Sequence, residues 1–164
     1  TGTKSVNLAY ECVDPSTCIG QVLSINGSVI KANAKNASIT YLSQNLVFDN
    51  TGTANIPINY NDVGRVTLHG QLSLPATGND PAKVLQGSSN SFVVKPYTLF
   101  VSQALTPTGG SNPAATNAAG VAAGFVAGGS PFQVKVEARK FPGTASTDIT
   151  PNFGRKIRAK VALN

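Results

Sequence analysis

The sequence contains little charge and few of the residue types that catalytic and metal sites use. Only 12% of its 164 residues are charged, against about 25% in an average soluble protein. It has no tryptophan and a single histidine, His69, and its seven carboxylates are scattered along the chain. A calcium loop needs several carboxylates at short spacing, and a catalytic histidine needs partners close by. We therefore expect no enzymatic activity, no cofactor and no metal site.

The sequence also lacks a helical pattern and a membrane-spanning segment. No stretch repeats apolar residues every three or four positions, and sixteen glycines with ten prolines favour short strands and turns. The apolar stretch 118–127 is too short and too rich in glycine to cross a bilayer. Because methionine is absent even from position 1, we expect a processed chain or an excised fragment. These absences predict an all-β protein that does not insert into a membrane.

Alternation of apolar and polar residues predicts most of the β-strands. Successive side chains of a strand point to opposite faces, so each such strand has one face for a core and one for solvent. His69 falls on the solvent face of its strand. The strands predicted in this way lie at residues 6–12, 56–60, 65–74, 98–103, 132–139 and 157–163.

Turn residues assign three further segments. Asn26-Gly27, with apolar residues on both sides, predicts a hairpin with a type I′ turn. Residues 61–64, Asn-Asp-Val-Gly, predict a tight turn that pairs the strands on either side of it, with Asp62 accepting hydrogen bonds from nearby backbone amides. Residues 75–90, rich in proline, glycine, serine and asparagine, are predicted to form a loop.

Cys12 and Cys18 are the only cysteines, and five residues separate them. A turn through Asp14-Pro15 would bring the two sulfurs within bonding distance. A four-coordinate zinc site is the weaker interpretation, because two sulfurs and one histidine do not complete it. We therefore predict a disulfide, which would place the protein in an oxidising compartment outside the cytosol.

The formal charge of +6 is concentrated in the last thirty or so residues. Such a basic face is suited to an anionic ligand such as an acidic polysaccharide. The interpretation that we favour is that these cations alternate with apolar residues and form the solvated side of a sheet, where lysines also discourage aggregation. The candidate anionic-ligand face comprises Lys135, Arg139, Lys156, Arg158 and Lys160.

Lys95-Pro96 marks the predicted boundary between two β-sandwich modules, 1–95 and 96–164. Proline removes a hydrogen-bond donor from a sheet and holds the chain extended, which allows one module to close and the next to open. Residues 105–130, dominated by alanine, glycine, asparagine and threonine, are predicted to be mostly loop. The second half is short for a seven-stranded sandwich, so either it is incomplete or both halves share one larger sandwich.

Four segments and the cysteine-containing opening are together similar to one known family. The segments are YNDVGRVTLHGQL (60–72), SFVVKPYTLFV (91–101), GGSPFQVKVEA (128–138) and TPNFG (150–154). They resemble the C-terminal region of MshQ-like proteins, which are large bacterial surface proteins associated with the mannose-sensitive haemagglutinin type IV pilus. The resemblance implies tandem immunoglobulin-like β-sandwich modules, with 91–101 as the join and TPNFG in a second module that is incomplete.

These observations together lead to one expected function and one alternative. We expect a non-enzymatic structural or adhesive domain of an exported, extracellular or cell-surface, pilus-associated protein. It would assemble through exposed strand edges with other domains or copies of the same protein. The alternative is a carbohydrate-binding module of a surface adhesin or secreted enzyme, with glycans as partners. A hydrolase would require folding to bring two carboxylates together, and we expect no nucleic-acid partner.

Overall fold

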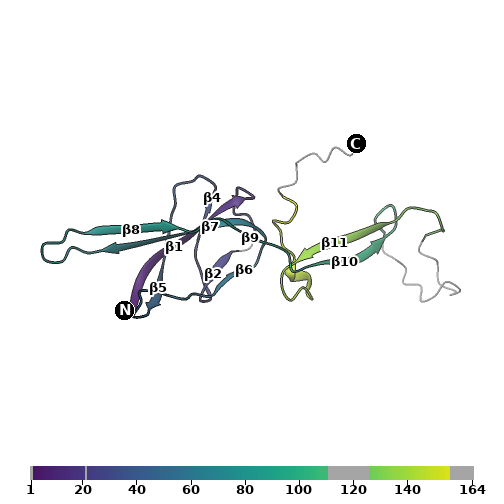
Figure 1. Ribbon diagram of the computed structural model, residues 1–164. Coiled ribbons are helices and arrows are strands. Elements are labelled where there is room, and N and C mark those ends of the chain that lie inside the picture. Colours follow the sequence, from purple (N-terminus) through teal and green to yellow (C-terminus); the bar gives the residue numbers. More distant parts are fainter. Residues whose placement is uncertain (1, 21, 111–125, 156–164) are drawn as a thin grey trace. The chain divides into compact units, whose positions relative to one another are not determined.

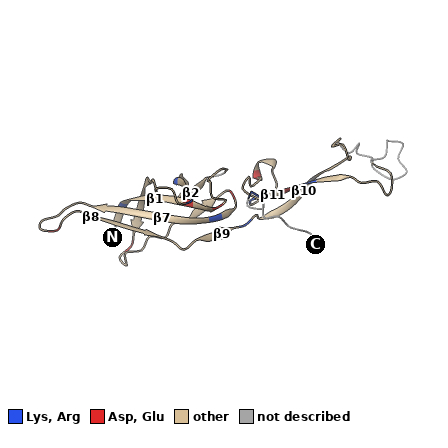
Figure 2. Cartoon of the chain, turned by 90° about the horizontal axis from the view of Figure 1, so that it is seen from above, with Lys and Arg blue, Asp and Glu red and all other residues tan. Residues whose placement is uncertain are grey.

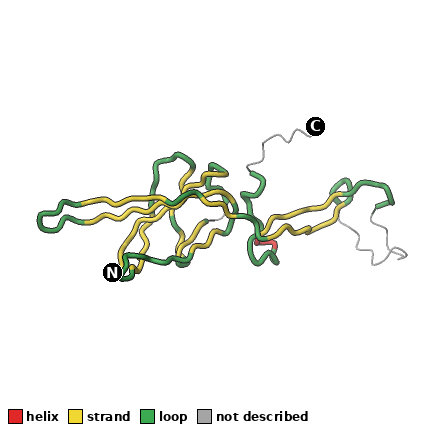
Figure 3. Tube along the Cα trace, viewed as in Figure 1, coloured by secondary structure: helices red, strands yellow, loops and turns green. Residues whose placement is uncertain are grey.

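A computed structural model describes residues 2–20, 22–110 and 126–155 of the chain, and these residues form strands and turns (Figure 1). One turn of 3₁₀ helix, Ser146–Asp148, is the helical structure found in this described part (Figure 3). The all-β expectation is therefore confirmed. The strands are β1 (Gly2–Asp14), β2 (Leu23–Ile25), β3 (Ser28–Val29), β4 (Lys31–Ala34), β5 (Leu42–Phe48), β6 (Ile58–Tyr60), β7 (Gly64–Leu74), β8 (Lys83–Ser88), β9 (Phe92–Val94), β10 (Thr98–Leu105) and β11 (Gln133–Arg139).

The chain divides into two compact units. Within the described residues, unit 1 comprises 2–95 and 150–155, and unit 2 comprises 96–110 and 126–149. The first division follows Lys95, next to the proline at which the sequence predicts a boundary. TPNFG, which the resemblance places in a second module, belongs to unit 1 by its contacts. The predicted strand at 157–163 lies outside the described residues.

The larger sheet of unit 1 is organised around β1 and β7, which are the longest strands. They pair antiparallel, from Asn7 opposite Gln71 to Asp14 opposite Arg65. On the other edge of β1, β4 pairs parallel and β5 pairs antiparallel. On the other edge of β7, β8 and β9 both pair antiparallel. β1 and β7 therefore lie in the middle of the sheet, with β4 and β5 beyond β1 and with β8 and β9 beyond β7.

A smaller sheet with the order β3-β2-β6 supplies the second layer of unit 1. Asn26 and Gly27 both have positive φ, 50° and 79°, which is the geometry of the predicted type I′ hairpin between β2 and β3. The apolar residues that alternate along β1 and β7 meet those of β2 between the layers. The buried core consists of Val6, Leu8, Tyr10, Cys12, Leu23, Ile25, Ile30, Leu46 and Val66.

The predicted pairing of residues 56–60 with 65–74 is wrong. β6 pairs with β2 in the smaller sheet, whereas β7 pairs with β1 in the larger one. The turn between them is a corner that carries the chain from one layer to the other, and Gly64 has a φ of 140° there. A Cβ at Gly64 would lie 2.7 Å from the backbone oxygen of Asp14, so the corner requires glycine. The alternation of residues shows that β6 and β7 each have an apolar face, but it does not show which strand pairs with each of them.

The prediction of a loop over residues 75–90 is also wrong, because β8 lies within it. β8 pairs with β7 from His69 opposite Ser88 to Leu74 opposite Lys83. All six residues of β8 are exposed. The strand therefore buries no apolar stripe, and the alternating pattern that reveals other strands is missing.

Unit 2 contains an antiparallel ribbon of β10 and β11, both of which the sequence predicts. The register places one set of apolar side chains on a single face of the ribbon. We call this set the apolar ribbon face, and it comprises Leu99, Val101, Val134 and Val136. Their exposed fractions are 60%, 61%, 52% and 53%. The alternation in β10 and β11 thus correctly predicts an apolar face, but this face is exposed and not buried in a core.

Candidate functional site

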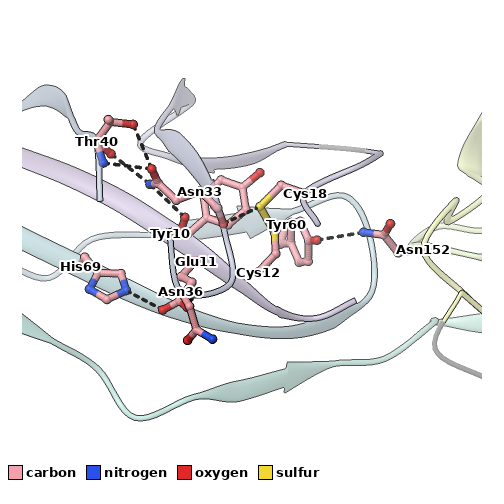
Figure 4. Close-up of a disulfide and its surroundings, with 10 residues drawn as sticks. All are labelled: Tyr10, Glu11, Cys12, Cys18, Asn33, Asn36, Thr40, Tyr60, His69 and Asn152. Atoms are coloured by element: carbon pink, nitrogen blue, oxygen red, sulfur yellow. Dashed lines mark hydrogen bonds and ion pairs between the residues drawn. A yellow bond between two sulfur atoms is a disulfide. The ribbon is translucent and has the colours of Figure 1, made fainter. Parts of the chain in front are cut away.

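His69 lies on the outer face of the larger sheet, as predicted, and pairs with Glu11. Its Nε2 is 3.3 Å from Oε2 of Glu11 on the neighbouring strand (Figure 4). Ala9 is opposite His69 in the register, so Glu11 is its diagonal neighbour. The other carboxylate oxygen of Glu11 accepts the backbone N–H of Asn36 at 2.8 Å. The pair has no signal in the sequence because 58 residues separate its members.

A shallow groove borders His69 on the same outer face. It has a volume of about 320 Å³ and is lined by Tyr41, His69, Gln86, Gly87 and Ser88. A tyrosine ring can stack on an apolar patch of a ligand, while the amide and hydroxyl groups can form hydrogen bonds. The groove therefore combines the types of group that recognise a neutral polar ligand.

The predicted disulfide between Cys12 and Cys18 is confirmed, with Cα atoms 5.5 Å apart. Cys12 is 2% exposed at the end of β1, so the bond anchors the following turn to the core. Asn33, near the disulfide in Figure 4, donates from Nδ2 to the backbone oxygen of Thr40 at 3.0 Å. Its Oδ1 accepts the backbone N–H of Thr40 at 2.9 Å. A covalent bond and several hydrogen bonds thus hold this region together.

The disulfide is also informative about the compartment in which the chain folds. Disulfides form and persist in oxidising compartments. Among the described residues, no helix is both long enough and apolar enough to cross a membrane. In the same part of the chain, no cluster of histidine, cysteine and carboxylate side chains has the arrangement of a metal site.

A buried polar cluster joins TPNFG to the corner between β6 and β7. Asp62 is 1% exposed, and its Oδ1 accepts the backbone N–H groups of Val63 at 2.9 Å and Asn152 at 3.0 Å. The predicted role of Asp62 as an acceptor for backbone amides is thus observed. Nδ2 of Asn152 donates to the hydroxyl oxygen of Tyr60 at 3.3 Å (Figure 4). Burial, and secondarily the charge of Asp62, raises the pKa of Tyr60 to about 12.

The structure describes two residues of the candidate anionic-ligand face, and both contact one carboxylate. Arg139 is 4% exposed, and its Nη2 and Nε lie 2.6 and 3.0 Å from Oε2 of Glu137. The guanidinium also stands 3.8 Å above the ring centre of Phe100. Nζ of Lys135 is 3.1 Å from the other oxygen of Glu137, although this lysine is largely exposed. The remaining members, Lys156, Arg158 and Lys160, lie outside the described residues.

This arrangement makes Glu137 the centre of a charged cluster. Hydrogen bonds from Arg139 and then Lys135 hold the pKa of Glu137 below its ordinary value. Nη1 of Arg139 donates to the backbone oxygen of Gly143 at 3.1 Å. The guanidinium is therefore engaged within unit 2, and we assign it a structural role.

Among the described residues, two surfaces are suited to a protein partner. The first is β8, which pairs with β7 and with no second strand among the described residues. In Figure 2, little of the ribbon along β8 and the adjoining part of β7 has the colours of charged residues. The second surface is the apolar ribbon face of unit 2. An exposed strand edge presents unpaired backbone groups, and an exposed apolar face favours burial against a partner.

Comparison with known proteins gives one match. A family model described as "Domain of unknown function (DUF6701), first Ig-like domain" matches residues 1–88. The match covers most of unit 1, from β1 to the end of β8. No curated protein and no solved structure matches the chain.

Proposed function

The chain belongs to the DUF6701 family through its first Ig-like domain, and from this premise we propose that it is a non-enzymatic structural module of an exported bacterial surface protein. The resemblance to MshQ-like proteins supports a pilus-associated or adhesive setting. The disulfide supports an extracellular or cell-surface location. The module contributes a rigid scaffold, and its partners are other domains or copies of the same protein.

The apolar ribbon face carries this proposal. A two-stranded ribbon by itself is marginally stable in water and needs a further layer or further strands. Leu99, Val101, Val134 and Val136 are each more than half exposed, and they lie together across two paired strands. Burying these side chains against a partner would remove their apolar surface from water and stabilise both partners. The ribbon is thus a surface that gains stability by association.

The open edge of β8 provides a second contact of a different kind. Strand addition there would satisfy backbone groups through a ladder of hydrogen bonds. Natural edge strands avoid such pairing by short length, proline or charge. β8 has six residues with one charge, Lys83, and no proline. Association through strand edges and association through the ribbon face are compatible in one assembly.

Light scattering on the purified chain over a range of concentrations tests the proposal. We expect the average mass to rise with concentration. The double variant Val101→Glu, Val136→Glu places charges on the apolar ribbon face and should reduce the rise. Gln103→Glu is the matched control, because Gln103 lies on the opposite face of β10, across from Lys135. A chain that stays monomeric at high concentration would exclude self-assembly.

The groove beside His69 favours a second candidate function, that of a carbohydrate-binding module. Tyr41 supplies a ring, and Gln86 and Ser88 supply hydrogen-bonding groups at its side. A glycan array tests this candidate. If a glycan binds the chain, we expect Tyr41→Ala to abolish the binding. Tyr97→Ala is the control, because it removes an exposed tyrosine of unit 2 and should leave the binding unchanged. An array without binding would remove this candidate and leave the structural proposal standing.

A further inference from the structure

A second pocket lies on the inner side of the same sheet, between the two layers of unit 1. Its volume is about 380 Å³. Leu8 and Leu68 line it from the larger sheet, and Ile25 lines it from β2 of the smaller sheet. Ile30, which follows β3, and Ile56, which precedes β6, complete the lining on that side. These side chains are all aliphatic. The pocket reaches the surface beside β8, where Ser88 and Ser89 border it.

Two glycines form one wall of this pocket. Gly70 of β7 and Gly87 of β8 are direct cross-strand partners, and Leu8 is opposite Gly70 on the other side. Side chains at these two positions would point into the space between the layers, because they share the parity of Leu68. The absence of two neighbouring side chains therefore leaves the space open.

Neither glycine is required by the backbone or by crowding. Gly70 and Gly87 are not among the residues with positive φ. A Cβ at Gly87 would meet no atom within 4 Å, and a Cβ at Gly70 would meet only Cδ2 of Leu8, at an ordinary 3.7 Å. Glycine in a strand weakens the sheet and often marks a place where a ligand approaches the backbone closely. The effect of having glycine at both positions is that the pocket stays open.

The lining determines the kind of ligand. His69 also borders the pocket, but its ring pairs with Glu11 on the outer face of the sheet. Its contribution to the inner pocket is therefore main chain, and the inner wall carries no charge. The hydroxyl of Ser89 accepts the backbone N–H of Leu68 at 3.0 Å and donates to the backbone oxygen of Asn90 at 2.8 Å. The ligand must be apolar and neutral in the part that enters.

We propose that this glycine-walled pocket binds a small neutral apolar molecule, such as the alkyl chain of a long-chain alcohol. An aliphatic cavity of about 150 Å³ is enough to hold a benzene molecule, so this larger space accepts a chain of several carbons. The volume is also within the range of about 300–1,000 Å³ that is usual for small-molecule sites. The pocket adjoins β8, but this inference does not rest on the proposed association through the β8 edge or the apolar ribbon face.

Fluorescence titration of the full chain with the neutral dye N-phenylnaphthylamine tests the proposal. We expect saturable binding with one dye per chain at protein concentrations where the chain is monomeric. Decanol should displace the dye, and decanoate of equal chain length should do so less well because the wall has no cation to neutralise it. An absence of binding, or displacement that does not distinguish the two competitors, would overturn the proposal.

Substitutions on opposite faces of β8 identify the location of the bound dye. Gly87→Leu fills the pocket and should weaken dye binding by at least about tenfold while the thermal midpoint is kept or raised. Gly87→Ala fills less space and should weaken binding less. Gln86→Val is the control, because it adds an apolar side chain to the outer face of the same strand and should leave binding unchanged.

Three results would overturn the assignment of the pocket. If a folded Gly87→Leu or Gly87→Ala chain binds the dye as tightly as the original chain, the dye is bound elsewhere. If binding is instead abolished by Val101→Glu with Val136→Glu, the dye binds the apolar ribbon face. A fall in dye binding as the protein concentration rises would show that a neighbouring copy occupies the pocket, which also contradicts the proposal.

Discussion

The backbone N–H of Asn152 donates a hydrogen bond to Oδ1 of Asp62 over 3.0 Å, joining positions 90 residues apart in the sequence. The same oxygen accepts the N–H of Val63, so one buried carboxylate organises both the corner after β6 and the TPNFG segment. Asp62 is packed closely enough against Gly20 that a side chain at position 20 would collide with it. A single acidic residue therefore joins two separate segments of unit 1 by hydrogen bonds and packs against a third.

Replacing Asp62 by alanine should destabilise unit 1. The change leaves two buried backbone donors without their acceptor, and each such group costs about 1–3 kcal/mol. Urea unfolding followed by the tyrosine fluorescence of unit 1 measures the effect. Asp80→Ala is the matched control, because Asp80 is exposed and its observed hydrogen bonds are made by its backbone. Equal midpoints for the two variants would contradict the role assigned to Asp62.

The raised pKa of Tyr60 predicts a loss of stability in alkaline solution. Burial favours the neutral phenol in the folded state and raises its pKa to about 12. The stabilisation is complete below the ordinary tyrosine value of about 10 and is lost as pH rises from there towards the folded value. Tyr60→Phe should therefore lose stability less steeply over this range, as measured by unfolding at a series of pH values. Parallel curves for both proteins would be inconsistent with this account.

The two cations on Glu137 should contribute unequally to the stability of unit 2. Arg139 is buried and bonds to Glu137 through two nitrogens, whereas Lys135 is largely exposed. Removing Arg139 leaves the buried carboxylate of Glu137 with only the exposed Lys135 as a cation, so Arg139→Ala should lower the thermal midpoint of unit 2 by roughly 10 °C or more. Lys135→Ala should change it little, since exposed ion pairs are weak. Circular dichroism melting curves compare the two, and a larger effect of Lys135→Ala would refute the assignment.

Removing the disulfide should destabilise unit 1 without changing its fold. The bond closes a short loop, and the chain-entropy model gives about 2 to 3 kcal/mol for a loop of this length. The double variant Cys12→Ala, Cys18→Ala tests this by urea unfolding without leaving a free thiol. Adding a reducing agent to the original chain should lower its urea unfolding midpoint by a similar amount. The same treatment should leave the midpoint of the double variant unchanged. A double variant as stable as the original would show that the bond contributes little.

Much of the fold follows from local sequence features. Alternation along residues 6–12 and 65–74 is sufficient to predict β1 and β7, because each buries one face against the core. Asn26-Gly27 is sufficient for the β2–β3 hairpin, since both positions need positive φ. The short spacing of the two cysteines is sufficient for the disulfide. In each case the physical cause lies within a few neighbouring residues.

The features that the sequence did not reveal depend on contacts between distant segments. β6 has the same alternating pattern whether it pairs with β7 or with β2, so its partner could not be predicted. β8 buries neither face and leaves no pattern. The approach of Glu11 to His69 requires the register between β1 and β7. Arg139 and Glu137 are only two residues apart on β11, but the burial of Arg139 requires β10, whose Phe100 lies under the guanidinium. A candidate anionic face that looked solvated thus contains a buried cation.

Hydrogen–deuterium exchange of the backbone amides, measured at increasing chain concentration, tests the central claim of assembly through open strands most directly. The amides of β8 and of the β10–β11 ribbon should become more protected as concentration rises, while those of β1 and β7 should change little. Val101→Glu with Val136→Glu should abolish the change in the ribbon. Exchange that is independent of concentration at β8 and in the ribbon would contradict the account.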